Sequence, residues 1–315
     1  MVEETKKSLL ITGAAGMLGE DLLRLFSPRY AVSGIDVRTP KYKDADFIAC
    51  DLLDSGCLED VFRVSKPWLV LHAAAYTDVD GCERDPERAE RINAALTGNL
   101  VRLCKKHNAK LVYISTDYVF DGTKHSAYNE NDAPNPLNVY GRSKLNGEIT
   151  IREKLEEFLI IRTSWLFGHY GRNFVSAIIN KALEEKTLHV VDDQRGSPTY
   201  TVSLARAIDG LIEAVFIPKT RREYCGIYHI SNSGNCSWYE FAKAIIDLKG
   251  IAAEVIPVDS MFVKRPACRP VVSILDNRRY EQVTAQRLCH WQEALKYYLG
   301  QEEQHFDVSD IVKVT

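Results

Sequence analysis

The sequence contains no long run of apolar residues. Over 315 residues, no apolar stretch approaches the ~18 to 20 residues needed to span a bilayer. The apolar stretch near the N-terminus is interrupted by Gly13 and Gly16, so we expect no signal peptide. Low-complexity linkers and internal repeats are also missing from the sequence. We therefore expect a cytoplasmic protein without a membrane partner.

The sequence also lacks a charge excess and a metal-binding pattern. Lys and Arg number 40 against 43 Asp and Glu, a net charge of -3, which gives no electrostatic case for a nucleic-acid partner. The eight cysteines include no C-x-x-C pair and are accompanied by no histidine cluster. We expect them to be reduced, mostly buried thiols, and we expect no metal site. Hydrophobic residues make up 45% of the chain, enough for a sizeable core.

A glycine-rich segment follows the first apolar run. Ser8–Thr12 has strand character, Gly13–Gly19 comes next, and Glu20–Phe26 is typical of a helix. This order is the dinucleotide-binding context, although the spacing is G-x-x-G-x-x-G. In such a turn the first glycine allows a tight bend, the second lets the backbone approach the pyrophosphate, and the third lets helix and strand pack closely. The cofactor-binding residues predicted here are Gly13, Gly16, Met17, Leu18 and Gly19.

The second predicted strand, Tyr30–Asp36, ends in a carboxylate. Asp36 stands where an acidic side chain accepts hydrogen bonds from the adenosine ribose, which favours NAD(H). Arg38 leaves NADP(H) as a second candidate, because a guanidinium can bind a 2′-phosphate. Residues after the next two strands are further candidates for cofactor contact: Asp51, Leu52, Ala73, Ala74 and Ala75.

Strands and helices alternate through the first half of the chain. The predicted strands after Asp36 are Asp46–Cys50, Pro67–His72, Ala109–Ser115 and Phe158–Thr163, and a helix runs from Asp85-Pro86 to about His107. This alternation predicts an α/β fold with a doubly wound parallel sheet of Rossmann type. We expect residues 1–164 to form the dinucleotide-binding domain, with strands near 187–191 and 225–230 as candidates to rejoin it.

The second half has a different character. We expect residues 165–300 to form mainly a smaller α/β substrate-binding domain. Three helices are predicted there. The first begins at Ser203, the second runs from the capping box Ser237–Glu240 to Gly250, and the third runs from about Glu281 to Leu299. Residues 301–315 are expected to be a loosely held tail.

Tyr140 and Lys144 are separated by four residues, so both project from one face of a helix. An ammonium group one turn away is expected to lower the pKa of the phenol, giving a proton donor for a carbonyl that is reduced to an alcohol. Thr116 lies at the end of the predicted strand Ala109–Ser115, where ligands of open α/β sheets bind. Asn93, on the preceding helix, either positions a proton-relay water or has a purely structural role.

Five blocks in order along the chain resemble one family. They are Ser115–Gly122, Asn135–Lys144, Arg162–Gly168, Asp193–Thr199 and Arg265–Asp276. The chain resembles the extended short-chain dehydrogenase/reductase superfamily and, within it, most resembles the dTDP-4-dehydrorhamnose reductases. The resemblance implies an NAD(P)H-dependent oxidoreductase that reduces a 4-keto sugar attached to a nucleotide, in deoxysugar synthesis for surface polysaccharide. Residues 75–80 follow the family pattern only in part.

The resemblance also implies roles for individual residues. Thr116, Tyr140 and Lys144 would be catalytic, with Tyr140 and Lys144 also at the cofactor. The implied substrate-binding residues are Asp117, Tyr118 and Trp165 at the sugar, Gln194, Pro198 and Thr199 at the nucleotide, and Arg269 at the diphosphate.

Two alternatives to this enzyme remain open. The regulatory subunit of methionine adenosyltransferase resembles the same family and would bind cofactor without turnover. A reductase or epimerase acting on another nucleotide sugar is the second alternative. The sequence fixes neither the nucleotide base, nor the sugar stereochemistry, nor whether the chain forms a homodimer.

Overall fold

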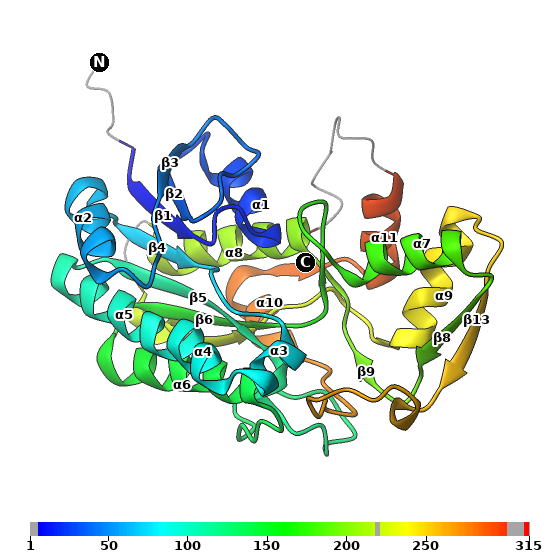
Figure 1. Ribbon diagram of the computed structural model, residues 1–315. Coiled ribbons are helices and arrows are strands. Elements are labelled where there is room, and N and C mark those ends of the chain that lie inside the picture. Colours follow the sequence, from blue (N-terminus) through cyan, green and yellow to red (C-terminus); the bar gives the residue numbers. More distant parts are fainter. Residues whose placement is uncertain (1–5, 218–220, 301–311, 315) are drawn as a thin grey trace.

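A parallel β-sheet with helices on both faces organises most of the chain (Figure 1). The computed structural model describes residues 6–217, 221–300 and 312–314. The strand order in the sheet is β11-β6-β5-β4-β1-β2-β3, and all of its paired strands are parallel. Its members are β1 (Ser8–Thr12), β2 (Ala31–Asp36), β3 (Asp46–Ala49), β4 (Leu69–His72), β5 (Lys110–Thr116), β6 (Phe158–Thr163) and β11 (Gly226–His229). The predicted doubly wound sheet is confirmed.

Each face of the sheet packs on its own set of helices. On β1, Leu9 and Ile11 enter one core while Leu10 enters the other, because successive side chains of a strand alternate between faces. The first core contains α1 (Met17–Phe26), α8 (Thr201–Phe216) and α10 (Arg278–Thr284). The second contains α2 (Ser55–Ser65), α5 (Leu96–His107) and α6 (Val139–Lys154). Burial on both faces explains why the strands are continuously apolar.

The helical segment from Pro86 to His107 follows the prediction, with one irregularity. Asp85 caps α4 (Pro86–Glu90), accepting from the Arg88 N–H, and Pro86 occupies the first turn. A π-helical segment, η1 (Arg91–Ala95), then leads directly into α5. A short helix, α3 (Val79–Arg84), precedes this segment.

A second group of elements lies beside the sheet, to the right in Figure 1. Strands β8 (Thr187–Val191) and β13 (Glu254–Val258) pair in parallel and pack with α7 (Phe174–Glu184), α9 (Trp238–Lys249) and α11 (Trp291–Gly300). The shorter strands are β7 (Leu166–Phe167), β9 (Arg195–Gly196), β10 (Thr199–Tyr200), β12 (Cys236–Ser237), β14 (Gln286–Leu288) and β15 (Val312–Val314). Single 3-10 turns are η2 (Asp117–Val119), η3 (Arg222–Tyr224) and η4 (Ser260–Phe262).

Of the two later strands considered as additions to the main sheet, one joins it. β11 pairs with β6, whereas β8 pairs with β13 in a separate two-stranded sheet. The domain boundary after residue 164 stays a prediction. Helix α8 comes after that boundary in the chain but packs against α1 in the core of the first half, so the two halves are not separate in space.

The predicted helix from Glu281 to Leu299 is wrong. The chain leaves α10 at Ala285, whose φ of 52° is left-handed, and then forms β14 before α11 begins. Val312–Val314 pairs with β14 in antiparallel fashion, so this part of the expected loose tail is a strand. Residues 301–311 and 315, the rest of that tail, lie outside the described residues.

The expectation that all cysteines are reduced is also wrong. A disulfide joins Cys50 and Cys57, whose Cα atoms are 6.2 Å apart. The turn between β3 and α2 brings the two thiols together, an arrangement that a search for C-x-x-C spacing misses. The free cysteines Cys82, Cys104, Cys236 and Cys289 are buried as predicted, Cys225 is half-buried and Cys268 is exposed. Among the described helices, none is both long and apolar enough to cross a bilayer.

Candidate active site

The glycine-rich loop lies where the strand order reverses, between β1 and β4. Gly13 has a φ of 70°, and a Cβ atom there would lie 2.7 Å from the Ala74 nitrogen. A side chain at Gly19 would collide with the carbonyl of Gly13, so this glycine permits the close packing of α1 on the loop. Gly16 caps α1 without a side-chain hydrogen bond, which leaves the first N–H groups of the helix available to a phosphate.

A pocket of about 400 Å³ opens beside this loop. Most of the predicted cofactor residues line it: Gly13, Gly16, Asp36, Arg38, Asp51, Leu52, Ala73, Ala74 and Ala75. The carboxylate of Asp36 accepts the N–H groups of Ala15, at 3.1 Å, and Arg38, at 3.0 Å. Asp36 therefore braces the loop as well as facing the pocket, while the side chain of Arg38 is 72% exposed.

A second pocket, of about 530 Å³, brings the predicted catalytic residues together. Thr116, Tyr140 and Lys144 all line it, together with Gly16, Met17 and Leu18 of the glycine-rich loop. Thr116 closes β5, and the other two lie one turn apart on α6. The helix is fixed at its start by Asn138, whose side chain accepts the Gly141 N–H at 2.8 Å. Tyr140 and the glycine-rich loop thus border one cavity.

Without bound ligands, the pKa values of Tyr140 and Lys144 differ from the expectation that the lysine lowers the pKa of the phenol. Burial raises the pKa of Tyr140 above its ordinary value, and a hydrogen bond with Thr116 opposes that rise. Burial also lowers the pKa of Lys144 to about 7, an effect that Glu148 opposes. The predicted lowering of the Tyr140 pKa is therefore not present here, because the low-dielectric site disfavours the charged forms of both groups.

Lys144 is held by groups that the sequence did not indicate. Its side chain is buried, and its ammonium nitrogen lies 4.0 Å from the centroid of the Tyr113 ring. Glu148, one turn further along α6, is fully buried. It accepts from Ser115 at 2.5 Å and from two nitrogens of Arg162 at 3.0 and 2.6 Å. These bonds join α6 to β5 and β6 one turn away from Lys144.

Asn93 is engaged in a structural role. Its side chain accepts the Tyr76 N–H and donates to the Tyr76 carbonyl and to Ser143, at 2.8, 3.1 and 3.0 Å. These bonds hold the loop after β4 against α6. The structural alternative is the one that these contacts support.

The three residues expected at the sugar line the same pocket as Thr116, Tyr140 and Lys144. The ring of Tyr118 meets that of Tyr140 edge-on, with centroids 6.0 Å apart. Burial raises the pKa of Asp117 to about 7, against the opposing bonds with Ser273 and Thr116. Trp165 has a left-handed backbone, with φ of 48°, and stacks on Trp238 with centroids 3.4 Å apart. Trp238 also lines the pocket and was noticed in the sequence only as part of a helix cap.

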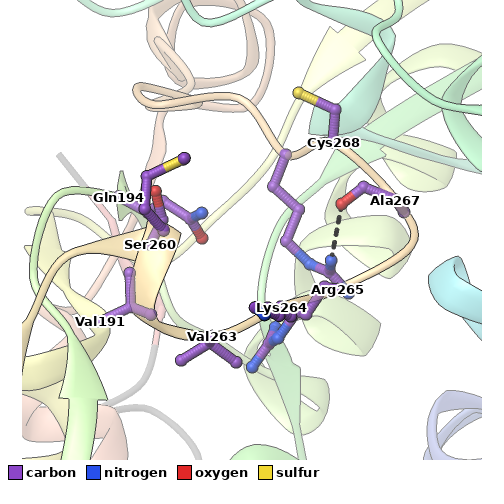
Figure 2. Close-up of a pocket in the computed structure, with 10 residues that line it drawn as sticks. Val191, Gln194, Ser260, Val263, Lys264, Arg265, Ala267 and Cys268 are labelled. Atoms are coloured by element: carbon purple, nitrogen blue, oxygen red, sulfur yellow. Dashed lines mark hydrogen bonds between the residues drawn. The ribbon is translucent and has the colours of Figure 1, made fainter.

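A third pocket, of about 350 Å³, lies beyond Tyr118. Its lining residues are Val191, Gln194, Ser260, Met261, Val263, Lys264, Arg265, Ala267, Cys268 and Arg269. Figure 2 shows Val191, Gln194 and Ser260 on one side and Lys264, Arg265, Ala267 and Cys268 on the other. Burial and Asp117 raise the pKa of Tyr118 to about 12, and Arg269 and Arg265 oppose that rise. Both guanidiniums therefore lie near Tyr118, which lines the second pocket.

Two residues expected at the nucleotide lie elsewhere. Pro198 and Thr199 are buried, and neither is among the residues that line the third pocket. The Thr199 N–H donates to the Trp165 carbonyl at 3.2 Å, because β10 pairs with β7 just behind that tryptophan. Pro198 and Thr199 therefore pack next to the segment that carries Trp165 and do not line the third pocket.

Arg269 lines the third pocket, but its guanidinium is already engaged. It donates to both carboxylate oxygens of Asp80, at 3.1 and 3.0 Å, and to the Ala267 carbonyl at 3.0 Å. Its side chain is only 10% exposed. Asp80 lies in the segment 75–80 that follows the family pattern only in part, so its role was not predicted.

Comparison with known proteins identifies the family. Residues 7–304 match the family described as RmlD substrate binding domain. The chain is 37% identical over 300 residues to the spore coat polysaccharide biosynthesis protein SpsK of Bacillus subtilis, covering 95% of this chain and 99% of the relative. It is 35% identical to a dTDP-4-dehydrorhamnose reductase of Aggregatibacter actinomycetemcomitans, covering 91% of this chain and 97% of that protein.

Solved structures agree with this relationship. The dTDP-4-dehydrorhamnose reductase of Bacillus anthracis in complex with NADP superposes with a TM-score of 0.86 at 35% identity, covering 95% of this chain and all of that one. An orthologue from Clostridium acetobutylicum gives 0.81 at 35% identity, covering 93% and 98%. Together with the glycine-rich loop and the shared pocket of Thr116, Tyr140 and Lys144, these matches show that the chain belongs to the dTDP-4-dehydrorhamnose reductase family.

Proposed function

We propose that this protein reduces the 4-keto group of a dTDP-linked 6-deoxysugar, converting dTDP-4-dehydrorhamnose to dTDP-rhamnose with NAD(P)H. The observation that carries the proposal is the pocket that Thr116, Tyr140 and Lys144 share with the glycine-rich loop. The bound cofactor supplies the hydride. The chain supplies the proton, the orientation of the carbonyl and a cavity that limits the access of water.

Tyr140 donates the proton to the sugar C4 oxygen as that oxygen gains charge. Thr116 hydrogen-bonds the same oxygen and keeps it in line with the phenol, since both side chains border one cavity. Lys144 restores the balance of charge once Tyr140 has lost its proton, because a cation beside a phenolate stabilises it. Asp117, Tyr118 and Trp165 fix the sugar ring within the same pocket.

The pocket beside the glycine-rich loop accepts the adenosine half of the cofactor. Asp36 faces the ribose hydroxyls there, so NADH is at least as good a donor as NADPH. Arg38 retains some NADPH activity, because its guanidinium is exposed and held only by a long ion pair of 3.9 Å to Asp36 and a bond of 3.4 Å to the Ala15 carbonyl, so it can turn toward a 2′-phosphate. The residues on this pocket are compatible with either cofactor.

The third pocket accepts the nucleotide of the substrate. It combines apolar side chains, the amide of Gln194 and cationic side chains, a combination suited to a base and a diphosphate. Binding energy from this remote part helps to position the reacting carbonyl. A free 4-keto-6-deoxysugar should therefore be a poor substrate.

A closely related substrate is the second candidate. One relative, 32% identical over 292 residues, is a dTDP-4-keto-6-deoxy-D-glucose reductase from Streptomyces niveus. The stereochemistry of the sugar therefore has to be determined by assay. The regulatory-subunit alternative has weaker support, since a protein that only binds cofactor has no need of the complete catalytic group.

The direct test follows NADH and NADPH absorbance with dTDP-4-dehydrorhamnose, dTDP-4-keto-6-deoxyglucose and the corresponding free sugars. The proposal expects rapid oxidation of reduced cofactor with the first compound and little with the free sugars. Tight cofactor binding without turnover of either dTDP-sugar would overturn it in favour of a regulatory role.

A further inference from the structure

The disulfide between Cys50 and Cys57 borders the pocket beside the glycine-rich loop. Cys50 lines this pocket, and so do Asp51, Leu52 and Leu53, which follow it directly in the chain. The two cysteines are seven positions apart, so these three residues belong to the loop that the bond closes. A change at the disulfide therefore acts on a wall of the pocket.

Cys50 is also connected to the residue that faces the ribose in the proposed function. Its N–H donates to the Asp36 carbonyl at 3.2 Å, next to the pairing of Asp36 with Ala49 in the sheet. The carboxylate of Asp36 in turn accepts the Ala15 N–H of the glycine-rich loop at 3.1 Å. The closed loop is thus joined to Asp36 and, through it, to the glycine-rich loop.

The other end of the closed loop belongs to a packed helix. Asp54 caps α2 by accepting the N–H groups of Gly56 and Cys57 at 2.9 and 3.1 Å. Leu58, in the first turns of the same helix, is fully buried in the core. The disulfide therefore cross-links the end of β3 to a fixed helix and restrains residues 51–56 between them.

The two sulfurs differ in access, which decides where an external thiol attacks. Cys50 is 4% exposed, whereas Cys57 is only half-buried. A thiolate of a dithiol attacks the Cys57 sulfur, the S–S bond breaks, and Cys50 leaves and takes up a proton. The second thiolate of the dithiol then closes its own disulfide, and Cys57 leaves as a thiolate beside the positive end of the α2 dipole. Two electrons pass from the dithiol to the protein.

The reverse reaction restores the bond. The Cys57 thiolate attacks a small disulfide such as glutathione disulfide, and one thiol is released. Cys50 then attacks the Cys57 sulfur of the mixed disulfide and displaces the second thiol. Two electrons pass from the protein to the oxidant, which ends as two thiols.

We propose that Cys50 and Cys57 form a thiol–disulfide exchange site that sets the affinity of the protein for its nicotinamide cofactor, with the disulfide form binding more tightly. The bond restricts residues 51–56 before the cofactor arrives, so less conformational entropy is lost when this segment contacts the adenosine. The proposal rests on the proposed function, which places the adenosine in this pocket.

Calorimetric titration compares the two forms directly. The protein is oxidised with glutathione disulfide or reduced with dithiothreitol, and alkylation with mass spectrometry confirms the state of Cys50 and Cys57. NADH should bind the oxidised form about 3- to 10-fold more tightly, the scale expected for ordering one or two side chains. ADP-ribose should show the same ratio, because it carries the adenosine half and lacks nicotinamide. A difference seen with NADH but not with ADP-ribose would contradict the proposal.

Two variants separate this bond from other effects of the reductant. Cys57→Ser cannot form the disulfide and leaves Cys50 in the pocket wall, so it should bind NADH as the reduced wild type does, with or without dithiothreitol. Cys225→Ser removes a half-buried cysteine that lines none of the three pockets and is the matched control. It should keep the wild-type difference between the oxidised and reduced forms. Circular dichroism confirms the fold of both variants.

Equal affinities of the oxidised and reduced wild type for NADH would overturn the proposal and leave the proposed reductase function intact. The same holds if Cys50 and Cys57 stay as free thiols in glutathione disulfide. If neither form binds NADH or NADPH, the cofactor assignment of the proposed function fails, and the proposal fails with it.

Discussion

The ammonium nitrogen of Lys144 lies over the face of the Tyr113 ring, 4.0 Å from its centroid. Both side chains are buried, so the ring contributes a cation–π contact in a site with little water. Burial lowers the pKa of Lys144 to about 7, and Glu148 opposes that shift. A cation–π contact with Tyr113 also favours the charged amine. We interpret Tyr113 as a positioning residue for Lys144.

This interpretation predicts different outcomes for two substitutions. Tyr113→Phe keeps the ring and should retain turnover within about twofold, whereas Tyr113→Leu should lower kcat by several-fold to about 30-fold. In Tyr113→Leu, the lower pH limit of activity that Lys144 controls should also shift, because the amine loses a contact that favours its charge. Equal kcat values and identical pH profiles for the two variants would refute the interpretation. Thermal unfolding checks that both variants are folded.

The stack of Trp165 on Trp238 leads to a prediction on substrate affinity. Trp165 holds a left-handed backbone, an arrangement that costs free energy and needs support from its surroundings. Trp238→Leu removes the stacked ring and should raise KM for the dTDP-sugar by several-fold, while KM for the cofactor stays the same. Steady-state kinetics with each substrate varied in turn measure both values. An unchanged sugar KM would show that Trp165 needs no support from Trp238.

Cofactor choice depends on the charge of Asp36. Asp36→Asn removes the charge and keeps an oxygen that can accept the N–H of Ala15 or Arg38, so the loop should stay in place. The ratio of kcat/KM for NADPH to that for NADH should rise, because the repulsion of a 2′-phosphate is removed. Arg38→Ala is the opposite variant and should lower the ratio. If Asp36→Asn leaves this ratio unchanged, Asp36 does not govern the choice between NADH and NADPH, and the choice depends on Arg38 alone.

The buried carboxyl of Asp117 should make the free energy of unfolding depend on pH. Burial raises its pKa to about 7, against about 4 in an unfolded chain. Between these values the folded state binds more protons than the unfolded state, so this carboxyl lowers the free energy of unfolding as the pH rises from about 4 to about 7. Relative to Asp117→Asn, the wild type should lose on the order of a few kcal/mol over that range.

Urea unfolding at several pH values between 4 and 7 measures this difference. Burial also lowers the pKa of His72 to about 3, but His72 is common to both proteins and its contribution cancels in the comparison. Asp44→Asn, at an exposed carboxylate, is the control and should follow the wild type. Parallel curves for the wild type and Asp117→Asn would contradict the assignment.

The features that could be predicted from the sequence are those that depend on residues close together in the chain. The sequence placed the glycine-rich turn, the pair Tyr140 and Lys144 and the apolar strands at one site, and the structure brings them together around one pocket. Each of these patterns depends on residues close together in the chain. The contact of Tyr113 with Lys144 and the pairing of Arg269 with Asp80 join residues 31 and 189 positions apart. Such contacts depend on how the elements pack, which periodicity does not reveal.

Some local features were also missed. The last helix was predicted to run through Ala285 without a break. In the structure, the left-handed backbone at Ala285 ends α10. The separate pairing of β8 with β13 follows from the packing of α7 and α9 beside them, since a strand pattern alone does not specify its partner. The Cys50–Cys57 disulfide depends on the turn between β3 and α2.

The measurement that tests the account most directly compares wild type and Tyr140→Phe in the oxidation of NADH by dTDP-4-dehydrorhamnose. The wild type should turn over the dTDP-sugar, and Tyr140→Phe should be slower by at least ~10²-fold, the usual loss on removing a positioned general acid. Cofactor affinity should change little, because the ring and the helix that carry the phenol remain. Near-normal turnover by Tyr140→Phe would contradict the assignment of Tyr140 as the proton donor.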